Sequence, residues 1–459
     1  KLRRLCWLKA VSSARSQCKC DDGACGISRV THLPHFMEST LQGTERKADG
    51  PTETTQLLKP TKAAPDGKAT GPQLTLNLVV CGLGTGIFTL PWSTAGASCT
   101  VGVLIVAGVL ALNAWTIFIL IEAAEVHQAF DIGSLLSSLP GALGRVAPPV
   151  VNAVIWIGGF FCLVSYVIVI ADCAGPMAGV AAWKLKALTS VLVLPLCFLD
   201  QRLLSFTSTF SVLAVILVFA LMTSVFMQDH QASLPICMAG LSWGSVSMFA
   251  SMMQTVVLQM CVLPMYGEMR NRSPGAFAKV VYWGFAVLFI VCASFALLGY
   301  FTFGSAVKSN VLLSLPTSRA GNLARLCAGA SVVGVYPIIL KPMIATLYRP
   351  GEGHDGLTTH WATGSVVAGV MMASLVLSDL GKLNIFNGAV SMGVFVAIVP
   401  FLVGCNLLQR FQQAESAKLA LYVLLVLGLI GSLLALILDD NYAKELASVC
   451  AWPVARLSA

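Results

Sequence analysis

Long apolar stretches recur along the chain from Leu74 onward, and they constrain the fold more than any other feature. A helix of about 20 residues crosses the hydrocarbon core of a bilayer. Eleven stretches reach approximately this length: residues 74–98, 101–122, 150–171, 177–199, 203–227, 243–266, 280–303, 322–341, 362–378, 384–405 and 419–438. A helix satisfies its own backbone hydrogen bonds in lipid. The sequence therefore predicts an all-α polytopic membrane protein with about 11 transmembrane helices.

Charge supports this assignment and predicts an orientation. Only 11% of residues are charged, against about 25% in a typical soluble domain. Residues 1–73 hold 12 of the 29 Lys and Arg and are too polar to fold alone, so we expect a disordered cytoplasmic N-terminal tail. A transmembrane domain over 74–438 with eleven spans then leaves 439–459 as a short non-cytoplasmic tail. No aromatic-interleaved basic patch accompanies the positive charge, which disfavours nucleic acid as a partner.

The first span contains three glycines and a proline within ten residues, from Gly82 to Pro91. Such a cluster favours local unwinding, which is tolerated at membrane depth only where the backbone is buried or lines a cavity. Unwound backbone at Gly84, Thr85 and Gly86 can bind a carboxylate, helped by the positive end of the half-helix that follows. The alternative is close helix packing, because Gly82 and Gly86 are four residues apart.

The sixth span carries Gln254, Thr255 and Gln259 in its middle. Transporters built from inverted repeats place interrupted helices at corresponding positions in their two halves. A polar span 6 and a glycine-broken span 1 fit a five-plus-five repeat, although the glutamines could instead connect neighbouring helices. In span 8, Tyr336 lies beside Pro337 and could face a cavity or belong to an interfacial aromatic belt.

Other chemistries find little support in the sequence. No nucleophile–base set, phosphate loop or metal-spaced His cluster lies within the spans, so neither an enzyme nor a cofactor or metal site is expected. A channel would need charged rings or a repeated filter loop. Cys173 and Cys237 both fall on the predicted non-cytoplasmic side, where they could form a disulfide or remain free thiols.

Several segments resemble the amino acid/auxin permease family. These are Thr75–Leu78, Gly84–Phe88 with Leu90-Pro91, Val262–Ser273, Gly299–Gly304, Asn310–Leu312 and Tyr336-Pro337. Their order and spacing agree with the span count, and together they extend from about Leu74 to Lys418. The resemblance implies a leucine-transporter-type fold, with a 5+5 inverted repeat and one extra helix. It also implies amino acid transport driven by protons or sodium.

The resemblance further implies which residues bind the substrate. The backbone around Gly84, Thr85 and Gly86 would hold the carboxylate, and groups near Thr255 and Gln259 would meet the amino group or the side chain. We also predict Ile87, next to the glycines, and Tyr336 in span 8 as substrate-binding residues. One departure concerns the coupling ion, because Val80 stands where sodium-coupled members have an Asn whose oxygen helps to ligate sodium. A valine side chain offers no oxygen, which favours a proton as the coupling ion, or exchange. Gln259 stands where many members have a His.

The predicted function is therefore secondary active transport of amino acids by alternating access around broken helices 1 and 6. Two alternatives remain, namely a sodium-coupled amino acid symporter and a membrane amino-acid sensor that uses the same site. The predicted location is a multi-pass position in the plasma membrane or in a vacuolar or lysosomal membrane.

Overall fold

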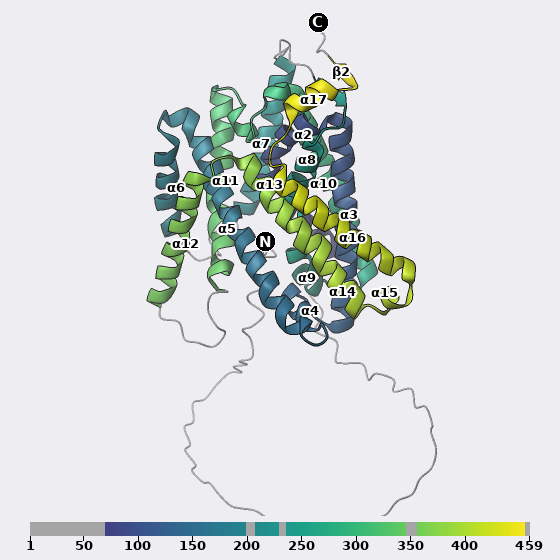
Figure 1. Cartoon of the computed structure of the whole chain (residues 1–459). Coiled ribbons are helices and arrows are strands. Elements are labelled where there is room, and N and C mark those ends of the chain that lie inside the picture. The colour runs from purple at the N-terminus through teal and green to yellow at the C-terminus, as the bar shows by residue number, and fades with distance from the viewer. Residues whose placement is uncertain (1–68, 199–206, 229–235, 346–355, 455–459) are drawn as a thin grey trace, which may run out of the picture. The chain divides into compact units, whose positions relative to one another are not determined.

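The computed structural model describes residues 69–198, 207–228, 236–345 and 356–454, which form a bundle of helices (Figure 1). Most of the predicted N-terminal tail, up to residue 68, lies outside the described residues. Packing begins before the predicted boundary at residue 73, because the Ala69 amide donates to Glu268 O (3.0 Å) and Ala69 O accepts from the Arg270 amide (2.9 Å). The first helix then begins at Gly71, where the Thr70 amide donates to Gln73 Oε1 (3.1 Å).

The first five predicted spans are occupied by helical segments in chain order. They are α1 (Gly71–Gly82) with η3 (Thr85–Thr89) and α2 (Leu90–Ala97), then α3 (Cys99–His127), α5 (Leu143–Ala178), α6 (Ala182–Leu196) and α7 (Thr207–Gln228). A short helix, α4 (Ile132–Ser137), connects α3 to α5. Spans 3 and 4 are thus single helices, whereas span 1 is broken.

The next five predicted spans are occupied in the same way, and one more helix follows. They are α8 (Gly244–Val256) with α9 (Gln259–Gly267), α10 (Pro274–Phe303), α11 (Arg319–Ala345), α12 (Gly356–Val376), and α13 (Leu380–Ser391) with η6 (Met392–Ile398) and α14 (Val399–Leu407). The extra helix is α16 (Glu415–Ile437). Short elements connect them: η4 (Gly304–Ala306), η5 (Val311–Leu313) and α15 (Gln409–Gln413).

The described helices are compatible with the predicted number of spans. Within the described residues, seven helices are long and apolar enough to cross a membrane, and there are eight if the bent pair of Gly71–Gly82 and Thr85–Ala97 is taken as one span. Three further predicted spans coincide with α6, which has 15 residues, and with α7 and α12, which contain the shorter apolar helices Val212–Gln228 and His360–Val376.

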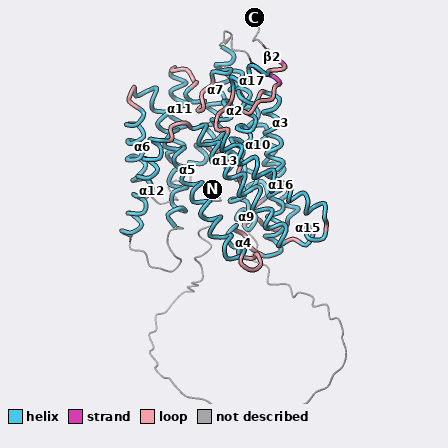
Figure 2. The backbone as a smooth tube through the Cα atoms, viewed as in Figure 1, coloured by secondary structure: helices cyan, strands magenta, loops and turns pink. Residues whose placement is uncertain are grey.

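Two faces of the bundle are distinguished by the elements at the helix ends. On one face lie α17 (Ala443–Val449) and the antiparallel pair of β1 (Ile236–Ala239) with β2 (Trp452–Val454), at the top of Figure 1. Figure 2 colours the strands of this pair magenta. We call this the β face. The opposite face carries α4 and the C-terminal end of α9, and we call it the α4 face. Span 1 runs from the α4 face to the β face, and span 6 runs in the opposite direction.

Among the described side chains of the helices, Lys186 and Arg325 are basic and buried, and both have carbonyl partners. Lys186 of α6, in the predicted span 177–199, donates from Nζ to the carbonyl of Ser374 in α12. Arg325 in α11 donates from Nε to Leu312 O (3.0 Å) and from Nη1 to Pro316 O (3.2 Å). Each therefore ties a helix to a neighbouring element, which explains how a charge can be accommodated there.

Candidate functional site

The predicted interruptions of spans 1 and 6 are both real breaks in the helices. Residues Leu83 and Gly84 separate α1 from η3, and the two parts of span 1 are bent by 47°. Gly84 has φ −84° and ψ −172°, an extended conformation outside the helical region. In span 6, Val257 has φ −72° and ψ 91°, so α8 ends one residue before and α9 restarts after Leu258.

The two broken spans come into direct contact at Gly86. A Cβ atom on Gly86 would lie 2.6 Å from Thr255 Oγ1 and 3.1 Å from Thr255 Cα. Only glycine fits this close approach without movement of span 6. The Gly86 carbonyl accepts a hydrogen bond from Thr89 Oγ1 (2.8 Å), and Asn384 Nδ2 of α13 donates to that same hydroxyl oxygen (3.4 Å). The contact therefore connects spans 1, 6 and 10.

A cavity of about 260 Å³ opens at these breaks. Most of its lining is apolar. Its polar side chains come from five elements, η3, α5, α8, α11 and α13: Thr85, Tyr166, Gln254, Thr255, Ser331, Asn387 and Ser391. Among the described residues that line it, none is Asp, Glu, Lys, Arg or His. Any charge on a bound molecule must therefore be met by backbone groups and neutral side chains.

Four of the seven predicted site residues lie together at this cavity. They are Gly84, Thr85, Gly86 and Thr255. Ile87 is fully buried and is not part of the lining. The other two predicted residues, Gln259 and Tyr336, do not line the cavity either.

Gln259 and Tyr336 are buried away from the cavity lining. Gln259 donates from Nε2 to Asn113 Oδ1 (2.7 Å) and Thr116 Oγ1 (3.2 Å), so it connects α9 to α3. Its Oε1 atom is buried and has no hydrogen-bond partner among the described residues. Tyr336 of α11 is 1% exposed and does not line the cavity.

Sequence reasoning missed several lining residues. Asn387 of α13 lines the cavity and donates from Nδ2 to Gly158 O of α5 (3.3 Å). Ser391 and Phe395 line it next to and within η6, a π-helical segment. Such segments occur frequently at functional sites. Two sequence features could have indicated that spans 3 and 10 line the cavity: the paired glycines Gly158 and Gly159 in span 3, and the polar residues of span 10.

The cavity extends from the breaks toward the α4 face. Val80 and Cys81 line it on the α4 side of the break in span 1, and Met260 and Cys261 line it on the α4 side of the break in span 6. No residue of α2, which is described throughout, lines it, and all eight α2 residues are buried. The β-face half of span 1 is thus tightly packed, whereas the space lies beside the other half.

Charged and aromatic side chains join the helix ends at the α4 face. Arg272 Nε lies 3.0 Å from Glu125 Oε2, and its guanidinium lies 4.2 Å from the Phe130 ring centroid. Tyr266 donates its hydroxyl hydrogen to the same carboxylate (2.8 Å). This hydrogen-bonded network connects the end of span 2 to the loop that follows span 6.

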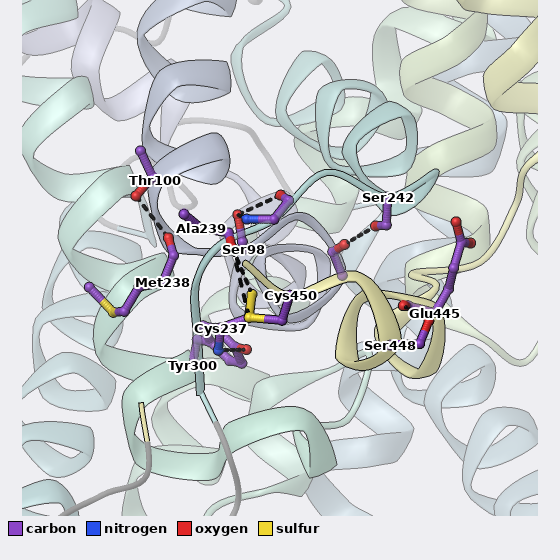
Figure 3. Close-up of a disulfide and its surroundings, with 12 residues drawn as sticks. Ser98, Thr100, Cys237, Met238, Ala239, Ser242, Tyr300, Glu445, Ser448 and Cys450 are labelled. Atoms are coloured by element: carbon purple, nitrogen blue, oxygen red, sulfur yellow. Dashed lines mark hydrogen bonds between the residues drawn. A yellow bond between two sulfur atoms is a disulfide. The ribbon is translucent and has the colours of Figure 1, made fainter. Parts of the chain in front are cut away.

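The Cys173–Cys237 disulfide considered from the sequence does not form. Cys237 in β1 forms a disulfide with Cys450, which lies just before β2 (Figure 3). Cys173 is a free, buried thiol packed near Gly329 of α11. Nothing in the sequence favoured Cys450, because it lies beyond the last span and is separated from Cys237 by 213 residues.

Among the described residues, no group of three or more His, Cys, Asp or Glu side chains is placed to hold a metal ion. The site is instead a neutral cavity between two broken helices within a bundle of membrane-crossing helices. Helix breaks of this kind bind substrates in secondary transporters with inverted repeats. The fold and the cavity together define this class of protein.

Comparison with known proteins identifies the family. Residues 67–438 match the family described as "Transmembrane amino acid transporter protein", and the chain belongs to this family. It is 22% identical to the putative sodium-coupled neutral amino acid transporter 11 of Danio rerio over 86% of this chain and 91% of that protein. It is 24% identical to vacuolar amino acid transporter 2 of Saccharomyces cerevisiae, over 73% and 76%.

A solved structure, the inward-facing conformation of Mhp1, has the same fold. It aligns with a TM-score of 0.57 at 13% identity and covers 86% of this chain and 95% of that one. The predicted membership of the amino acid/auxin permease family and the predicted leucine-transporter-type fold are both confirmed.

Proposed function

We propose that this protein transports neutral amino acids by alternating access, and that it binds them in the cavity between the breaks of spans 1 and 6. The observation that carries this proposal is that both breaks open into one cavity whose described lining residues include no charged side chain. A charged substrate side chain would find no counter-ion among them, and burying an unpaired charge is very costly.

The two charges of the amino acid backbone would be met by helix ends. The first amides of a helix and its last carbonyls have no partners within the helix. The amides of Thr85 and Gly86 begin the β-face half of span 1, and a carboxylate binds favourably at such an N-terminus. The carbonyls at the ends of α1 and α8 would accept hydrogen bonds from the ammonium group. Thr255 and Gln254 offer neutral polar contacts beside them.

The substrate side chain would lie among apolar groups from several helices. Val154 and Ile155 of α5, Val335 and Ile339 of α11, and Phe395 of η6 line the rest of the cavity. These groups favour aliphatic or aromatic side chains through the hydrophobic effect, worth about 25 cal/mol per Å² of apolar surface buried. Small polar amino acids should bind more weakly because they bury less apolar surface.

The proposed coupling is to protons, or the transport is exchange, rather than sodium symport. Val80 lines the cavity, and the family resemblance places an Asn of sodium-coupled members at this position. Sodium binds through oxygen ligands, and a valine side chain supplies none. The name of the zebrafish relative specifies sodium, so sodium dependence must be measured directly rather than assumed absent.

The proposed orientation places the α4 face in the cytoplasm. Three basic residues belong to helix ends or connections at that face, namely Arg145 at the start of α5, Arg272 after α9 and Arg410 in α15, and the positive-inside rule favours the cytoplasm for them. The Cys237–Cys450 disulfide lies at the β face, and disulfides persist in oxidising compartments. The structure would then correspond to a state whose cavity extends toward the cytoplasm. The host membrane would be the plasma membrane or a vacuolar or lysosomal one.

Uptake by proteoliposomes that contain the full chain tests this function. We expect labelled neutral apolar amino acids to be taken up or exchanged, lysine and glutamate to compete poorly, and replacement of sodium by choline to leave the rate unchanged. Dissipating an imposed pH gradient should lower net uptake if a proton is coupled and leave exchange unchanged. Absence of uptake and exchange for all amino acids would refute the proposal, and a strict sodium requirement would refute its coupling part.

A further inference from the structure

The residues after the last span form a continuous segment across the β face. This segment, residues 438–454, is called the C-terminal strap below. It begins at the end of α16, continues through α17 and ends in β2. Its first residue already contacts span 6, because Ser247 Oγ of α8 donates to Leu438 O (2.7 Å). The strap therefore crosses directly over the β-face half of a broken span.

Asn441 of the strap lies between the β-face halves of both broken spans. A Cβ atom on Gly96 of α2 would be 1.6 Å from the Asn441 carbonyl oxygen, and one on Gly244 of α8 would be 2.1 Å from it. Asn441 Nδ2 also donates to Trp92 O of α2 (3.3 Å). Both helices thus have glycine where the strap backbone requires it, so the strap is an integral part of the packing at this face.

The strap turns sharply after this contact. Tyr442 has φ 57° and ψ 28°, a left-handed conformation that is uncommon for a residue with a Cβ atom. Leu446 of α17 is 1% exposed, and its Cδ1 atom lies 3.0 Å from the place a Cβ atom on Gly240 would take. The turn and the buried leucine hold α17 on the bundle.

The strap is fastened at both ends. Near its start, Asp439 Oδ2 lies 3.1 Å from Lys382 Nζ of α13. Near its end, Cys450 is bonded to Cys237 of β1, and the Ala451 amide donates to Ala239 O (2.9 Å). The strap therefore connects span 10 to the segment that leads into span 6.

The strand β1 is itself held to the bundle, so the disulfide does not end on a loose loop. Figure 3 shows Tyr300 of α10 accepting a hydrogen bond from the Cys237 amide (2.9 Å). It also shows Thr100 of α3 donating to Met238 O (2.8 Å). Tension on Cys450 would therefore be transmitted to α3 and α10 as well as to β1.

We propose that the C-terminal strap is a brake on opening toward the β face, and that the Cys237–Cys450 disulfide fastens this brake. This inference rests on the proposed transport function. Alternating access requires the cavity to open toward both faces, largely through rocking of one part of the bundle against another. The β-face halves α2 and α8 lie above the cavity, and the strap backbone fills the gap between them. Opening must therefore displace the strap.

Releasing the disulfide should ease this displacement without removing the strap. A small-molecule dithiol reduces it by thiol–disulfide exchange, in which two protein thiols form and the dithiol becomes a cyclic disulfide. A reduced strap keeps its backbone contacts but is no longer held covalently at Cys450. We expect the β-face opening rate to rise about fivefold or more, the lower end of the range for couplings between sites.

The test measures opening independently of transport. Ser93 in α2 is fully buried and bonds to Ser251 of α8 (Oγ–Oγ 3.0 Å), so a Ser93→Cys thiol should react only when the β face opens. Its modification by a membrane-impermeant maleimide is followed by mass spectrometry in the full chain with the disulfide intact and with Cys237→Ser/Cys450→Ser. Cys405→Ser in α14 is the matched control for loss of a cysteine.

The expected result is labelling at least about fivefold faster in the double serine variant than in the intact and Cys405→Ser proteins. Asn441→Ala should act in the same direction while the disulfide stays formed, which separates a brake from a general effect of cysteine loss. Equal labelling rates in folded proteins, as judged by monodisperse elution and an unchanged melting curve, would overturn the proposal. If the double variant does not fold, the dithiol-treated Ser93→Cys protein, freed of reductant before labelling, gives the same comparison.

Transport is read in parallel to separate the two proposals. Transport that is present and unaffected by reduction, together with unchanged labelling, would overturn the brake alone. No transport in either oxidised or reduced protein would overturn the proposed function, while faster labelling would still support a strap that restrains opening.

Discussion

Replacing Gly86 by alanine should disrupt the contact on which the candidate site depends. The added methyl carbon would lie 2.6 Å from Thr255 Oγ1, 3.1 Å from Thr255 Cα and 3.3 Å from Thr255 Cβ. Rotating the hydroxyl away does not solve the problem, because the methyl carbon would still press on the backbone of Thr255. Thr255 Oγ1 also donates to Ser251 O (2.9 Å), so its movement would weaken that bond. Span 6 must therefore shift away from span 1 by several tenths of an ångström.

The size of the effect follows from overpacking. Inserting a methyl group into a well-packed interior typically costs about 1–3 kcal/mol. If the whole cost falls on the transport-competent arrangement, uptake at subsaturating substrate should drop by roughly 5- to 150-fold, since about 1.4 kcal/mol corresponds to tenfold. The thermal stability of the purified protein should fall as well, because the same contact holds the two spans together without substrate.

Two other glycines allow a sharp comparison. A Cβ atom on Gly84 would have no described neighbour within 4 Å, and its φ of −84° suits alanine. Gly84→Ala should therefore preserve the melting temperature, but its methyl group would intrude on the cavity and raise the KM for substrate. A Cβ atom on Gly108 in α3 also has no described neighbour within 4 Å. Gly108→Ala should leave transport unchanged and stabilise the helix slightly, by about 0.5–1 kcal/mol.

The assay is initial-rate uptake in proteoliposomes together with a thermal unfolding curve for each variant. If Gly86→Ala keeps wild-type uptake and stability, the close approach of Gly86 to Thr255 does not require a glycine, and the reasoning is refuted. Equal destabilisation by Gly84→Ala and Gly86→Ala would point instead to backbone freedom in the break as the shared requirement.

Three further substitutions test the surroundings of the cavity. Gln259→Leu removes the buried hydrogen bond to Asn113 and should lower stability by about 1–3 kcal/mol, while competition assays should show unchanged substrate preference because Gln259 does not line the cavity. Arg272→Lys loses the Nε contact with Glu125 and should destabilise by about 1–3 kcal/mol, measured by thermal unfolding; an unchanged curve would contradict a structural role. Arg325→Lys cannot reproduce the guanidinium fork on the loop carbonyls, so its melting temperature should fall, whereas a stable variant would show that one cation suffices.

The sequence predicted those features of the site that depend on the local amino-acid composition of a span. The glycine cluster around Gly84 and the polar centre of span 6 correctly predicted the two helix breaks. Gln259 was predicted to bind the substrate, but it does not line the cavity, and the reason is geometric. Residues 255 and 259 are four apart and would share a face on a continuous helix. The break at 257–258 resets the helical phase, so Thr255 faces the cavity while Gln259 faces α3.

The disulfide illustrates a second limit of sequence reasoning. Cys173 and Cys237 were considered as partners because both fall on the same predicted side, but a shared side does not bring two Cα atoms within bonding range. The actual partner, Cys450, comes close because the chain after span 11 folds back over the β face and pairs with β1. That path depends on tertiary packing at Asn441 and Leu446, which no local pattern in the sequence encodes.

Spans 1 and 6 are joined on both sides of their breaks, which limits where the bundle can bend. At the α4 face, the backbone of Ala69 pairs with the loop after α9. Beyond the breaks, Ser93 of α2 bonds to Ser251 of α8. These contacts join the two spans in this state, and opening toward the β face has to separate Ser93 from Ser251. Residues 83–84 and 257–258 lie between the contacts and outside the helices, so they are the places where each span can bend. Gly84, with open space where a side chain would stand, is the residue of the first break best able to change conformation without displacing a neighbour.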